Sequence, residues 1–280
     1  MIRTAVFALL ATSAFAAPAL AETRLEVRHA AARMIVIPEA RSDISWTVQG
    51  GRAGLPALQM RREGDKLILD GGLGEDHWRS RVHGCDLADH SVRIDGVGSV
   101  KLADLPVITA HVPLDARITA GEAVFGEIGP TRSLSIGNGG CGDWKVGPVQ
   151  GLAHVALGGM GSVRLDRVGD ADVDLGGMGN VSLASAGRLH VNIGGSGSVR
   201  AGEVTGDLHA NIGGRGDIQI ERGSTPHVYA NIAGSGSIVS GGTVGAVNAT
   251  IMGSGNIKAR EITGPIHKMV MGSGTVRAGV

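Results

Sequence analysis

Aromatic side chains are nearly missing from this sequence, since Phe, Trp and Tyr together make up 2% of its 280 residues. Proteins that stack bases or sugars on their surface need such rings, so a stacking platform of that kind is not expected. An excess of one charge is missing too, because 26 basic and 26 acidic residues give a formal net charge of zero. A general nucleic-acid-binding protein normally carries a basic excess, and we therefore expect no nucleic acid as a partner.

Long hydrophobic runs are equally scarce. One short apolar stretch, AVFALLATSAF, follows Arg3, and Ala19-Leu20-Ala21 fits the small-x-small pattern of a signal-peptide cleavage site. No later stretch approaches the roughly 18–20 apolar residues that a membrane-spanning helix needs. The sequence therefore predicts a signal peptide over residues 1–21, export to the periplasm or to the cell surface and extracellular space, and a mature chain without a membrane span.

Glycine, by contrast, is abundant, at 47 residues. A G-x-G core recurs along the chain at a nearly constant interval, beginning at Gly140, Gly159, Gly177, Gly195, Gly214, Gly234, Gly253 and Gly272. Weaker copies stand at Gly96 (DGVGSVKL) and Gly72 (GGLG). These positions are 18 to 20 residues apart. A nearly fixed period of this length is typical of stacked structural repeats.

Apolar residues alternate on both sides of each G-x-G core, which predicts strands rather than helices. The alternation aligns three inward columns: Val155, Val173, Val191, Ala210, Ala230 and Ala249; Leu157, Leu175, Ile193, Ile212, Ile232, Ile251 and Val270; and Val163, Val181, Val199, Ile218, Ile238, Ile257 and Val276. Equivalent strands would pair in parallel about 4.8 Å apart. The sequence thus predicts an all-β fold, a parallel β-helix or solenoid of about ten coils with a repeat of roughly 19 residues.

Two known kinds of glycine-rich binding motif, the calcium-binding β-roll and the phosphate-binding loop, do not match this sequence. The calcium-binding β-roll has a nine-residue repeat with an Asp ligand, whereas the corresponding positions here hold Val163, Val181 and Ile218, which belong to the predicted core. A phosphate-binding loop needs GK[ST] followed by a helix, and neither follows the glycines. We therefore interpret the glycines as turns of the solenoid and expect no cofactor.

The repeated unit G-x-G-[SN]-[VI]-x-[LA], together with the segment LPVITAHVPLDARITAG, resembles the putative auto-transporter adhesin "head GIN" domain family. The resemblance extends over roughly residues 24–280. It implies a β-solenoid and a role at the bacterial surface, and it supplies no catalytic residues. No C-terminal series of amphipathic strands of about ten residues follows, as an outer-membrane barrel would require.

The repeat also suggests how the mature chain is organised. We expect residues 22–280 to form one solenoid domain, with irregular coils and a cap over 22–95, a protruding loop over 75–91, and regular coils over 96–280. Lys268 stands where the first inward column has Ala or Val. It either stops further stacking of coils or reflects a shift of frame at Pro265.

The loop contains one of the two cysteines, Cys85; the other, Cys141, lies at a glycine turn. Export favours a disulfide between them. Coil counting from Gly96 places them about 9–10 Å apart, beyond the usual limit of roughly 7 Å between Cα atoms, so a bridge requires the loop to fold back. The alternatives are two separate thiols, or a metal site in which Cys85 joins other loop residues, His77, His83, Asp86, Asp89 and His90.

Two outward columns carry polar side chains. One reads His154, Asp172, His190, His209, Tyr229, Asn248 and His267, and its neighbour reads Ala156, Asp174, Asn192, Asn211, Asn231 and Thr250. Members about 4.8 Å apart could hold a divalent transition metal or a polar ligand. They could equally be a solvated ladder that stabilises the sheet. The candidate ligand-binding residues are His154, Asp172, Asp174, His190, Asn192, His209 and Asn211.

A basic stripe of Arg164, Arg200, Lys258 and Arg277 lies on the outward side of the strand after the glycines. It suits an anionic polysaccharide or lipid headgroup, or it is a solvated face. The function that this sequence predicts best is a structural or interaction module of the bacterial envelope, related to adhesion and without catalysis, with a protein or polysaccharide partner. The alternatives are a periplasmic ligand- or metal-binding protein, and a polysaccharide-active β-helix enzyme using Asp172 and Asp174.

Overall fold

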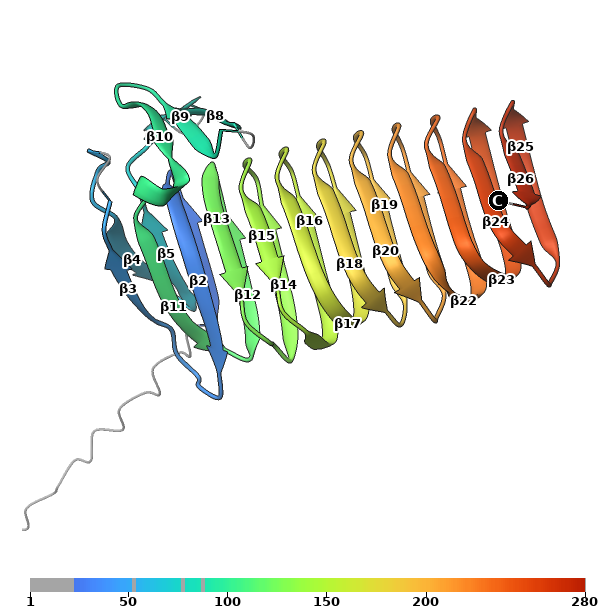
Figure 1. Ribbon diagram of the computed structural model, residues 1–280, viewed down its shortest axis with the longest axis horizontal. Helices are drawn as coiled ribbons and strands as arrows, with labels where there is room; N and C mark the ends of the chain where they lie inside the picture. The colour runs from blue at the N-terminus through green and yellow to red at the C-terminus, as the bar shows by residue number, and fades with distance from the viewer. Residues whose placement is uncertain (1–22, 52–53, 77–78, 87–88, 280) are drawn as a thin grey trace, which may run out of the picture.

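The computed structural model describes residues 23–51, 54–76, 79–86 and 89–279. The predicted signal peptide and His77 lie outside this part of the chain. The described residues contain no α-helix, and the one helical element is a short 3₁₀ turn, Leu102–Asp104. Everything else regular is strand, and Figure 1 shows the strands stacked as successive coils along one axis. The predicted fold class is confirmed: the chain is a parallel β-solenoid of about nine turns with a repeat of about 19 residues.

The regular part of the solenoid is built from strands that follow and precede each glycine turn, and the long strands β17, β22 and β23 combine a stretch of each kind. The strands are β14 (Ser133–Asn138), β15 (Asp143–Val146), β16 (Val149–Leu157), β17 (Ser162–Leu175), β18 (Asn180–Ala186), β19 (Leu189–Ile193), β20 (Ser198–Val204), β21 (Leu208–Ile212), β22 (Asp217–Ile232), β23 (Ser237–Gly253), β24 (Asn256–Ile262), β25 (Ile266–Gly272) and β26 (Thr275–Ala278). Every pairing among them is parallel, as between β19 and β21 or β18 and β20.

The alternating apolar residues predicted to face inward do so. The columns that begin at Val155, Leu157 and Val163 run through consecutive coils in register, and their members are buried as far as Ile251. One continuous core therefore extends from the first coil to the last. Because each coil buries its apolar side chains against the coils on either side, the stacking itself supplies the hydrophobic stabilisation.

The glycine turns are needed because the coils approach one another more closely there than a side chain allows. A Cβ atom built on Gly214 would lie 2.1 Å from the carbonyl oxygen of Gly195 in the preceding coil. The turns are also joined from coil to coil by backbone hydrogen bonds, such as Met178 N to Gly159 O at 3.1 Å. Glycine at this position of the repeat is thus a packing requirement.

The N-terminal region is arranged differently. Its strands are β1 (Arg24–Arg28), β2 (Ala31–Glu39), β3 (Ser45–Gln49), β4 (Gln59–Glu63), β5 (Lys66–Asp70), β11 (Val107–Pro113), β12 (Asp115–Ala120) and β13 (Ala123–Ile128). Strand β2 lies between β11 and β13 and pairs with both in parallel, and β1 lies between β5 and β12. The first strands of the chain are therefore inserted beside segments that come much later in the sequence.

Antiparallel strands cover this end of the solenoid. Strand β3 pairs antiparallel with β11, and β4 pairs antiparallel with β5. A sheet edge left open would offer unpaired backbone groups to other chains. Strands β3 and β4 lie at this edge, within the residues 22–95 where the sequence analysis placed a cap.

A small antiparallel unit projects from the same end, seen at the upper left of Figure 1. It contains β8 (Val82–Asp86), β9 (Ser91–Ile94) and β10 (Gly98–Lys101), with the short pair β6 (Gly74–Asp76) and β7 (Arg79–Ser80) beside it. A second, smaller core joins this unit to the outer side of the solenoid and includes Val92, Ile94, Val100 and Phe125. The predicted loop 75–91 is thus largely part of a folded sheet.

The motif DGVGSVKL is not a coil, which corrects the expectation that regular coils begin at residue 96. Strands β9 and β10 pair antiparallel, with Ile94 opposite Gly98, so the glycines form a hairpin turn. Gly96 and Gly98 have φ angles of 73° and 93°, which L-residues with side chains rarely adopt. The same letters that form a solenoid turn elsewhere here serve a tight turn between two antiparallel strands.

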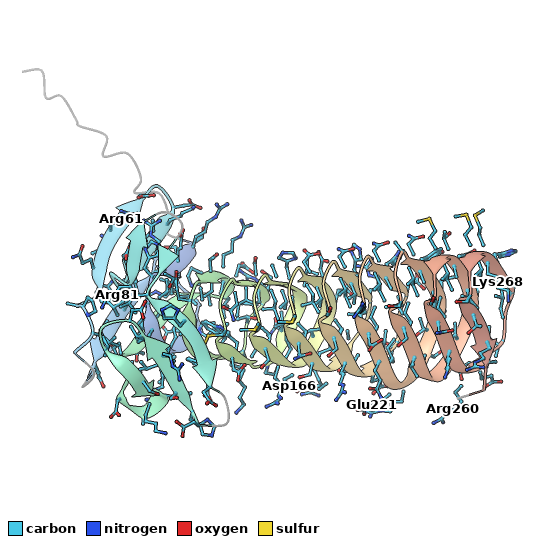
Figure 2. The ribbon with its side chains drawn as sticks, turned by 90° about the horizontal axis from the view of Figure 1, so that it is seen from above. Arg61, Arg81, Asp166, Glu221, Arg260 and Lys268 are labelled. Atoms are coloured by element: carbon cyan, nitrogen blue, oxygen red, sulfur yellow. A yellow bond between two sulfur atoms is a disulfide. The ribbon has the colours of Figure 1, made fainter. Side chains whose placement is uncertain are left out.

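Lys268 occupies the inward column, as the register predicts. It lies opposite Ala249 in an unbroken pairing of β23 with β25 that starts at Val247 and Ile266, so there is no shift of frame at Pro265. Lys268 lies at the far end of the solenoid from the antiparallel cap (Figure 2), and its side chain is exposed. A charged side chain in a column of Ala and Val is one of the devices that oppose further stacking on a sheet.

Candidate functional site

The polar face is the outer surface formed by two neighbouring columns on one side of the solenoid. The pairings of successive strands align His154, Asp172, His190, His209, Tyr229, Asn248 and His267 in the first column and Ala156, Asp174, Asn192, Asn211, Asn231 and Thr250 in the second. Both columns point outward because the residues between them belong to the buried core. The two columns therefore run side by side along the outside of the coils.

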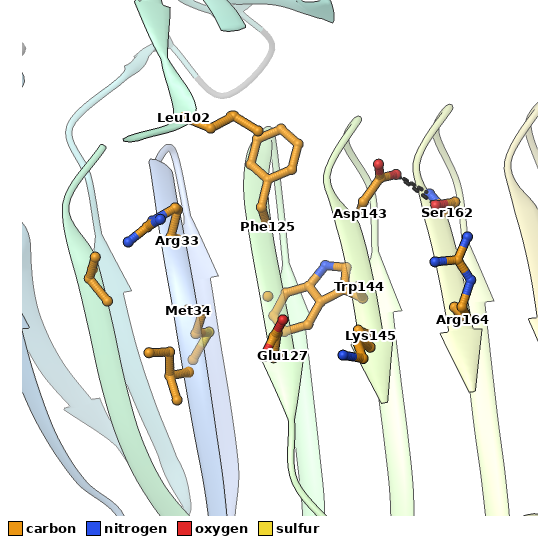
Figure 3. A pocket seen from close by; sticks show the side chains of 13 residues that line it. Arg33, Met34, Leu102, Phe125, Glu127, Asp143, Trp144, Lys145, Ser162 and Arg164 are labelled. Atoms are coloured by element: carbon orange, nitrogen blue, oxygen red, sulfur yellow. Dashed lines mark hydrogen bonds between the residues drawn. The ribbon is translucent and has the colours of Figure 1, made fainter. Parts of the chain in front are cut away.

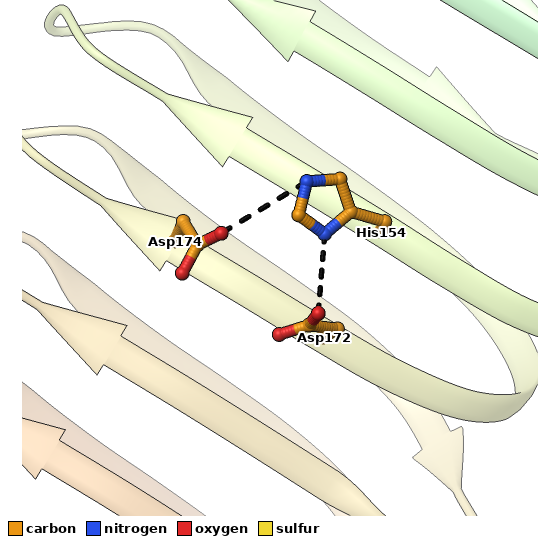
Figure 4. Close-up of side chains that lie close together, drawn as sticks. All are labelled: His154, Asp172 and Asp174. Carbon is orange, nitrogen blue, oxygen red and sulfur yellow. Dashed lines mark hydrogen bonds and ion pairs between the residues drawn. The ribbon is translucent and has the colours of Figure 1, made fainter.

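His154 lies against two carboxylates of the next coil, as Figure 4 shows. Its Nδ1 atom is 3.3 Å from Oδ2 of Asp172, and its Nε2 atom is 3.9 Å from Oδ2 of Asp174. The three side chains come from β16 and β17, whose parallel pairing places His154 directly opposite Asp172. The donor atoms of the three residues all lie within 4.8 Å of one another.

His190 extends this cluster on the far side of Asp172. Its Nδ1 atom lies 3.5 Å from Oδ1 of Asp172. That Oδ1 atom is buried and has no hydrogen-bond partner among the described residues. A buried carboxylate oxygen without a partner is unfavourable, so the cluster contains an oxygen with unused capacity to bind.

Asp174 is held by a chain of amides. Asn231 Nδ2 donates to Asn211 Oδ1 at 3.0 Å, Asn211 Nδ2 donates to Asn192 Oδ1 at 2.9 Å, and Asn192 Nδ2 donates to Asp174 Oδ1 at 2.8 Å. All three donors point toward the carboxylate, which is the direction that its negative charge favours. Asn192 therefore occupies one oxygen of Asp174 and leaves the other facing His154.

His209 and Asn211 are not part of the cluster. The ring of His209 stacks on Tyr229, with centroids 4.7 Å apart and planes 15° apart, and it meets His190 edge-on at 6.1 Å. No carboxylate lies beside it in its column. Of the seven predicted residues, the structure thus brings together His154, Asp172, Asp174 and His190. Asn192 supports Asp174 directly and Asn211 does so through Asn192, whereas His209 stands outside the cluster.

A shallow groove runs beside the amide chain. It has a volume of about 420 Å³ and is lined by Asn192, Asn211, Asn231 and Thr250, with Met252 at its edge. Ile193, Ile212, Ile232 and Ala233 also line it, and Met252 is 48% exposed, so the groove offers apolar surface beside the amides. Its amides are already hydrogen-bonded to one another.

An ion pair adjoins the cluster on the same strand. Arg188 donates two hydrogen bonds to Oδ2 of Asp170, at 2.6 and 3.1 Å, and its backbone N–H donates to Oδ1. The Arg188 side chain, followed by its backbone N–H, holds the pKa of Asp170 below its usual value. Asp170 is thus occupied, and it is not available to the His154 cluster.

The two cysteines are joined in a disulfide, with their Cα atoms 5.9 Å apart. Coil counting gave a longer separation because it treated residues 96–101 as a coil. The antiparallel unit instead folds against the solenoid, and Cys85 and Cys141 pack in the small core between them. The loop residues also have other partners: His83 Nε2 lies 2.5 Å from Oδ2 of Asp95, and Asp89 accepts from Lys101. The disulfide makes Cys85 unavailable as a metal ligand. Among the described residues, the other members of the predicted loop site, His83, Asp86, Asp89 and His90, do not come together as a group of three or more donors.

The cationic stripe lies on the stretches that follow the glycine turns, whereas the polar face lies on the stretches before them. Long strands such as β17 carry residues of both. The pairings align Lys145, Arg164, Ser182, Arg200, Gln219, Val239, Lys258 and Arg277 in one outward column. Among the described residues, none of its five cations forms an ion pair of the kind that holds Arg132, Arg188 or Arg222. Lys145 belongs to this stripe although the sequence analysis began it at Arg164; counting back one repeat from Arg164 would have found it.

A cavity of about 410 Å³ opens beside the first two cations of the stripe (Figure 3). Its lining includes Arg33, Phe125, Glu127, Lys145 and Arg164, and Leu102 of the antiparallel unit borders it. The sequence analysis missed this cavity because Arg33 reaches it through the insertion of β2 beside β13. No periodicity in the chain signals that insertion.

Residues 203–280 match the model of the family described as "Putative auto-transporter adhesin, head GIN domain". The match confirms the resemblance to this family over the last part of the chain, from the end of β20 through β26. A solved structure described as a putative lipid binding protein from Parabacteroides distasonis is similar at 16% identity, with 91% of each chain covered and a TM-score of 0.43. This likeness is too distant to carry an argument about function. No curated protein matches the chain. Among the described residues, no helix has the length and hydrophobicity to cross a membrane.

Proposed function

We propose that this chain is an exported interaction module of the bacterial cell envelope, related to adhesion, that acts by binding rather than by catalysis. The match of its last coils to an adhesin head domain supports this role. The solenoid supports it too, because it presents one outward side chain of each column per coil at a constant spacing. Such a surface suits a partner that is itself repetitive, such as a polysaccharide.

The cationic stripe is the observation that carries the proposal. Some arginines elsewhere on the surface are matched with carboxylates, as Arg132 is with Asp115 and Arg222 with Glu203. Others form no ion pair among the described residues, but they do not share one column as the cations of the stripe do. Along the stripe, Lys145 and Arg164 stand about 5 Å apart, and Arg200 follows about 10 Å from Arg164. Among the described residues, Glu127 lies opposite Lys145 at the start of this column without forming an ion pair, and from Arg164 onward the column holds no carboxylate. Such a row of cations favours an anionic polymer. We therefore infer that the partner is an anionic polysaccharide of the envelope or extracellular space.

A binding measurement with a defined probe tests this inference. Dextran sulfate should bind the mature chain, whereas neutral dextran should not, and the affinity should fall as salt is raised because the contact is electrostatic. We expect R164E/R200E to weaken binding of dextran sulfate about tenfold or more, taking each lost contact as about 1 kcal/mol and adding charge repulsion. The double variant R188E/R222E makes the same change in net charge outside the stripe and should retain most of the affinity. Equal losses in the two variants would show a nonspecific charge effect and contradict the assignment.

A second experiment tests the location. Protease is added to intact cells and to cells with a permeabilised outer membrane, with a periplasmic protein as control. Digestion on intact cells supports a role at the surface and in adhesion. Protection until permeabilisation, with the control intact, excludes surface adhesion and moves the binding role to the periplasm.

The proposal that the chain is not an enzyme rests on the geometry of its best candidate acids. Asp172 and Asp174 both face His154 from one strand, whereas the glycosidase mechanisms with paired carboxylates place them on either side of a scissile bond. Incubation with polygalacturonate tests this point directly. Turnover by the native chain that disappears in D172N/D174N would overturn it and favour a polysaccharide-active enzyme.

A further inference from the structure

The cluster around His154 has the composition and spacing of a transition-metal site. Zinc and related ions take nitrogen and oxygen ligands at about 2.0–2.2 Å, which places neighbouring ligand atoms roughly 3 to 4 Å apart. The observed separations are 3.3 Å from His154 to Asp172, 3.9 Å from His154 to Asp174 and 3.5 Å from His190 to Asp172. The donor atoms of His154, Asp172 and Asp174 all lie within 4.8 Å of one another, so small rotations would direct them to a common point. His190 approaches Asp172 from the far side and would have to turn further to supply the fourth donor.

The backbone holds the four residues in fixed positions. His154, Asp172 and His190 are consecutive members of one column, and Asp174 lies on the same strand as Asp172, pointing to the same face. Parallel ladders on both sides fix the strands that carry them. A site that is formed in advance avoids the cost of ordering its ligands on binding.

The surroundings orient the carboxylates toward the cluster. The amide of Asn192 occupies Oδ1 of Asp174 and leaves Oδ2 facing His154. The buried Oδ1 of Asp172 has no hydrogen bond among the described residues and lies toward His190. Outer hydrogen bonds of this kind orient ligands in metal sites. An ion bound at Oδ2 of Asp172, which faces His154, would reach Oδ1 as well only if the carboxylate binds through both oxygens.

From these contacts, we propose that the polar face binds one divalent transition-metal ion, of the Zn²⁺ class, through His154, Asp172, Asp174 and His190. Two imidazoles and two carboxylates make a four-donor set suited to such an ion. Ca²⁺ and Mg²⁺ favour all-oxygen sets of six or more ligands, so the site discriminates against them. The side chains are one third to nearly one half exposed, so the ion can enter from solvent.

Titration calorimetry of the full mature chain, without any histidine tag, tests the site. ZnCl₂ should bind with a stoichiometry of one ion per chain, and CaCl₂ should give no saturable signal. D172N/D174N keeps the shape of both side chains but removes their charge, and it should weaken zinc binding more than tenfold. Circular dichroism of the variant, with an unchanged unfolding midpoint in the absence of metal, shows that the fold is retained.

His209 provides a matched control. It lies in the same column one coil beyond His190 and has rings rather than carboxylates beside it. H209Q should bind zinc as the native chain does, whereas H154Q should lose most of the affinity. N192A tests the orientation of Asp174 and should cost about tenfold, because it removes the hydrogen bond that holds the carboxylate. A native chain that shows no saturable zinc binding would overturn the proposal, as would equal losses in H209Q and H154Q.

Discussion

The regular coils and the N-terminal region of this solenoid are stabilised by different kinds of contact. In the regular coils from β14 onward, chain order is spatial order, and each strand pairs with the equivalent strand of the next repeat. In the N-terminal region β2 lies between β11 and β13, antiparallel strands close the end, and a disulfide attaches an extra sheet. The interior coils are stabilised by similar neighbours on both sides. The first coils lack a neighbour on one side, and long-range pairings and covalent closure stabilise them in its place.

The disulfide should give the largest effect, and one confined to the N-terminal region. Removing it in C85A/C141A releases a loop closed over 56 residues, which corresponds to about 4 kcal/mol in the chain-entropy account. We expect amide hydrogen exchange to accelerate strongly in β8 to β10 and in neighbouring β13. The regular coils should keep their protection because they lie away from the small core that surrounds the bridge.

The reduced native protein provides the control for the substitutions. Reduction of the wild-type chain should reproduce the exchange pattern of C85A/C141A without substituting any side chain. Loss of protection along β19 to β24 would show that the two regions unfold as one unit and would contradict the distinction between them.

A methyl group added at a glycine turn should lower the stability of the regular coils. Gly214→Ala places a Cβ 2.1 Å from a backbone oxygen of the preceding coil, whereas at adjacent Gly213 the nearest atom is 3.8 Å away. We expect G214A to destabilise the protein by about 3 kcal/mol and G213A to have little effect. Urea unfolding followed by circular dichroism compares the two. A similar loss in both variants would mean that turn propensity, not contact between coils, selects glycine there.

Lowering the pH should have the smallest effect on stability. It can be followed through one ion pair in each region, Arg132 with Asp115 and Arg188 with Asp170. Arg132 with Ser133 lowers the pKa of Asp115 in the N-terminal region, and Arg188 lowers the pKa of Asp170 in the regular coils. A carboxyl whose pKa is depressed on folding contributes stability above its unfolded value, near 3.8, and loses it as the pH falls through the folded value.

The corresponding measurement compares R188Q with the native chain across that pH range. The difference in unfolding midpoint should be small at neutral pH, since the pair is exposed, and should vanish once Asp170 is protonated. R132Q should behave in the same way. A difference that grows as the pH falls would show that the arginines act other than through these carboxyls.

The regular coils were predictable because their information is local. Period-two alternation and glycine spacing give the strands, the inward columns and the alignment of His154 with Asp172 and His190. The insertion of β2 was not predictable, because it depends on pairings between distant segments that carry no shared motif. DGVGSVKL was misread for a related reason: Gly96 and Gly98 suit a solenoid turn and a hairpin turn equally well, and only the partner strand decides between them.

The candidate site was also predictable only in its local features. The columns predicted which residues share a face. The direction of the amide chain and the unpartnered oxygen of Asp172 depend on rotamers that periodicity does not determine. The cavity beside Lys145 needed Arg33, which reaches it only through the inserted strand.

The insertion of β2 has a consequence for the order in which the molecule folds. Strand β1 enters the solenoid with it, and pairing Arg24 with Arg117 closes a loop several times longer than the one between neighbouring regular coils, such as Leu189 with Leu208. By loop-closure entropy the longer closure costs about 1.4 kcal/mol more. We therefore expect the later coils to nucleate and grow toward the N-terminus, with β1 and β2 docking only after β11, β12 and β13 have been made. A chain that emerges N-terminus first can pair β1 with β5 early, but β2 has no partner until β11 and β13 have followed.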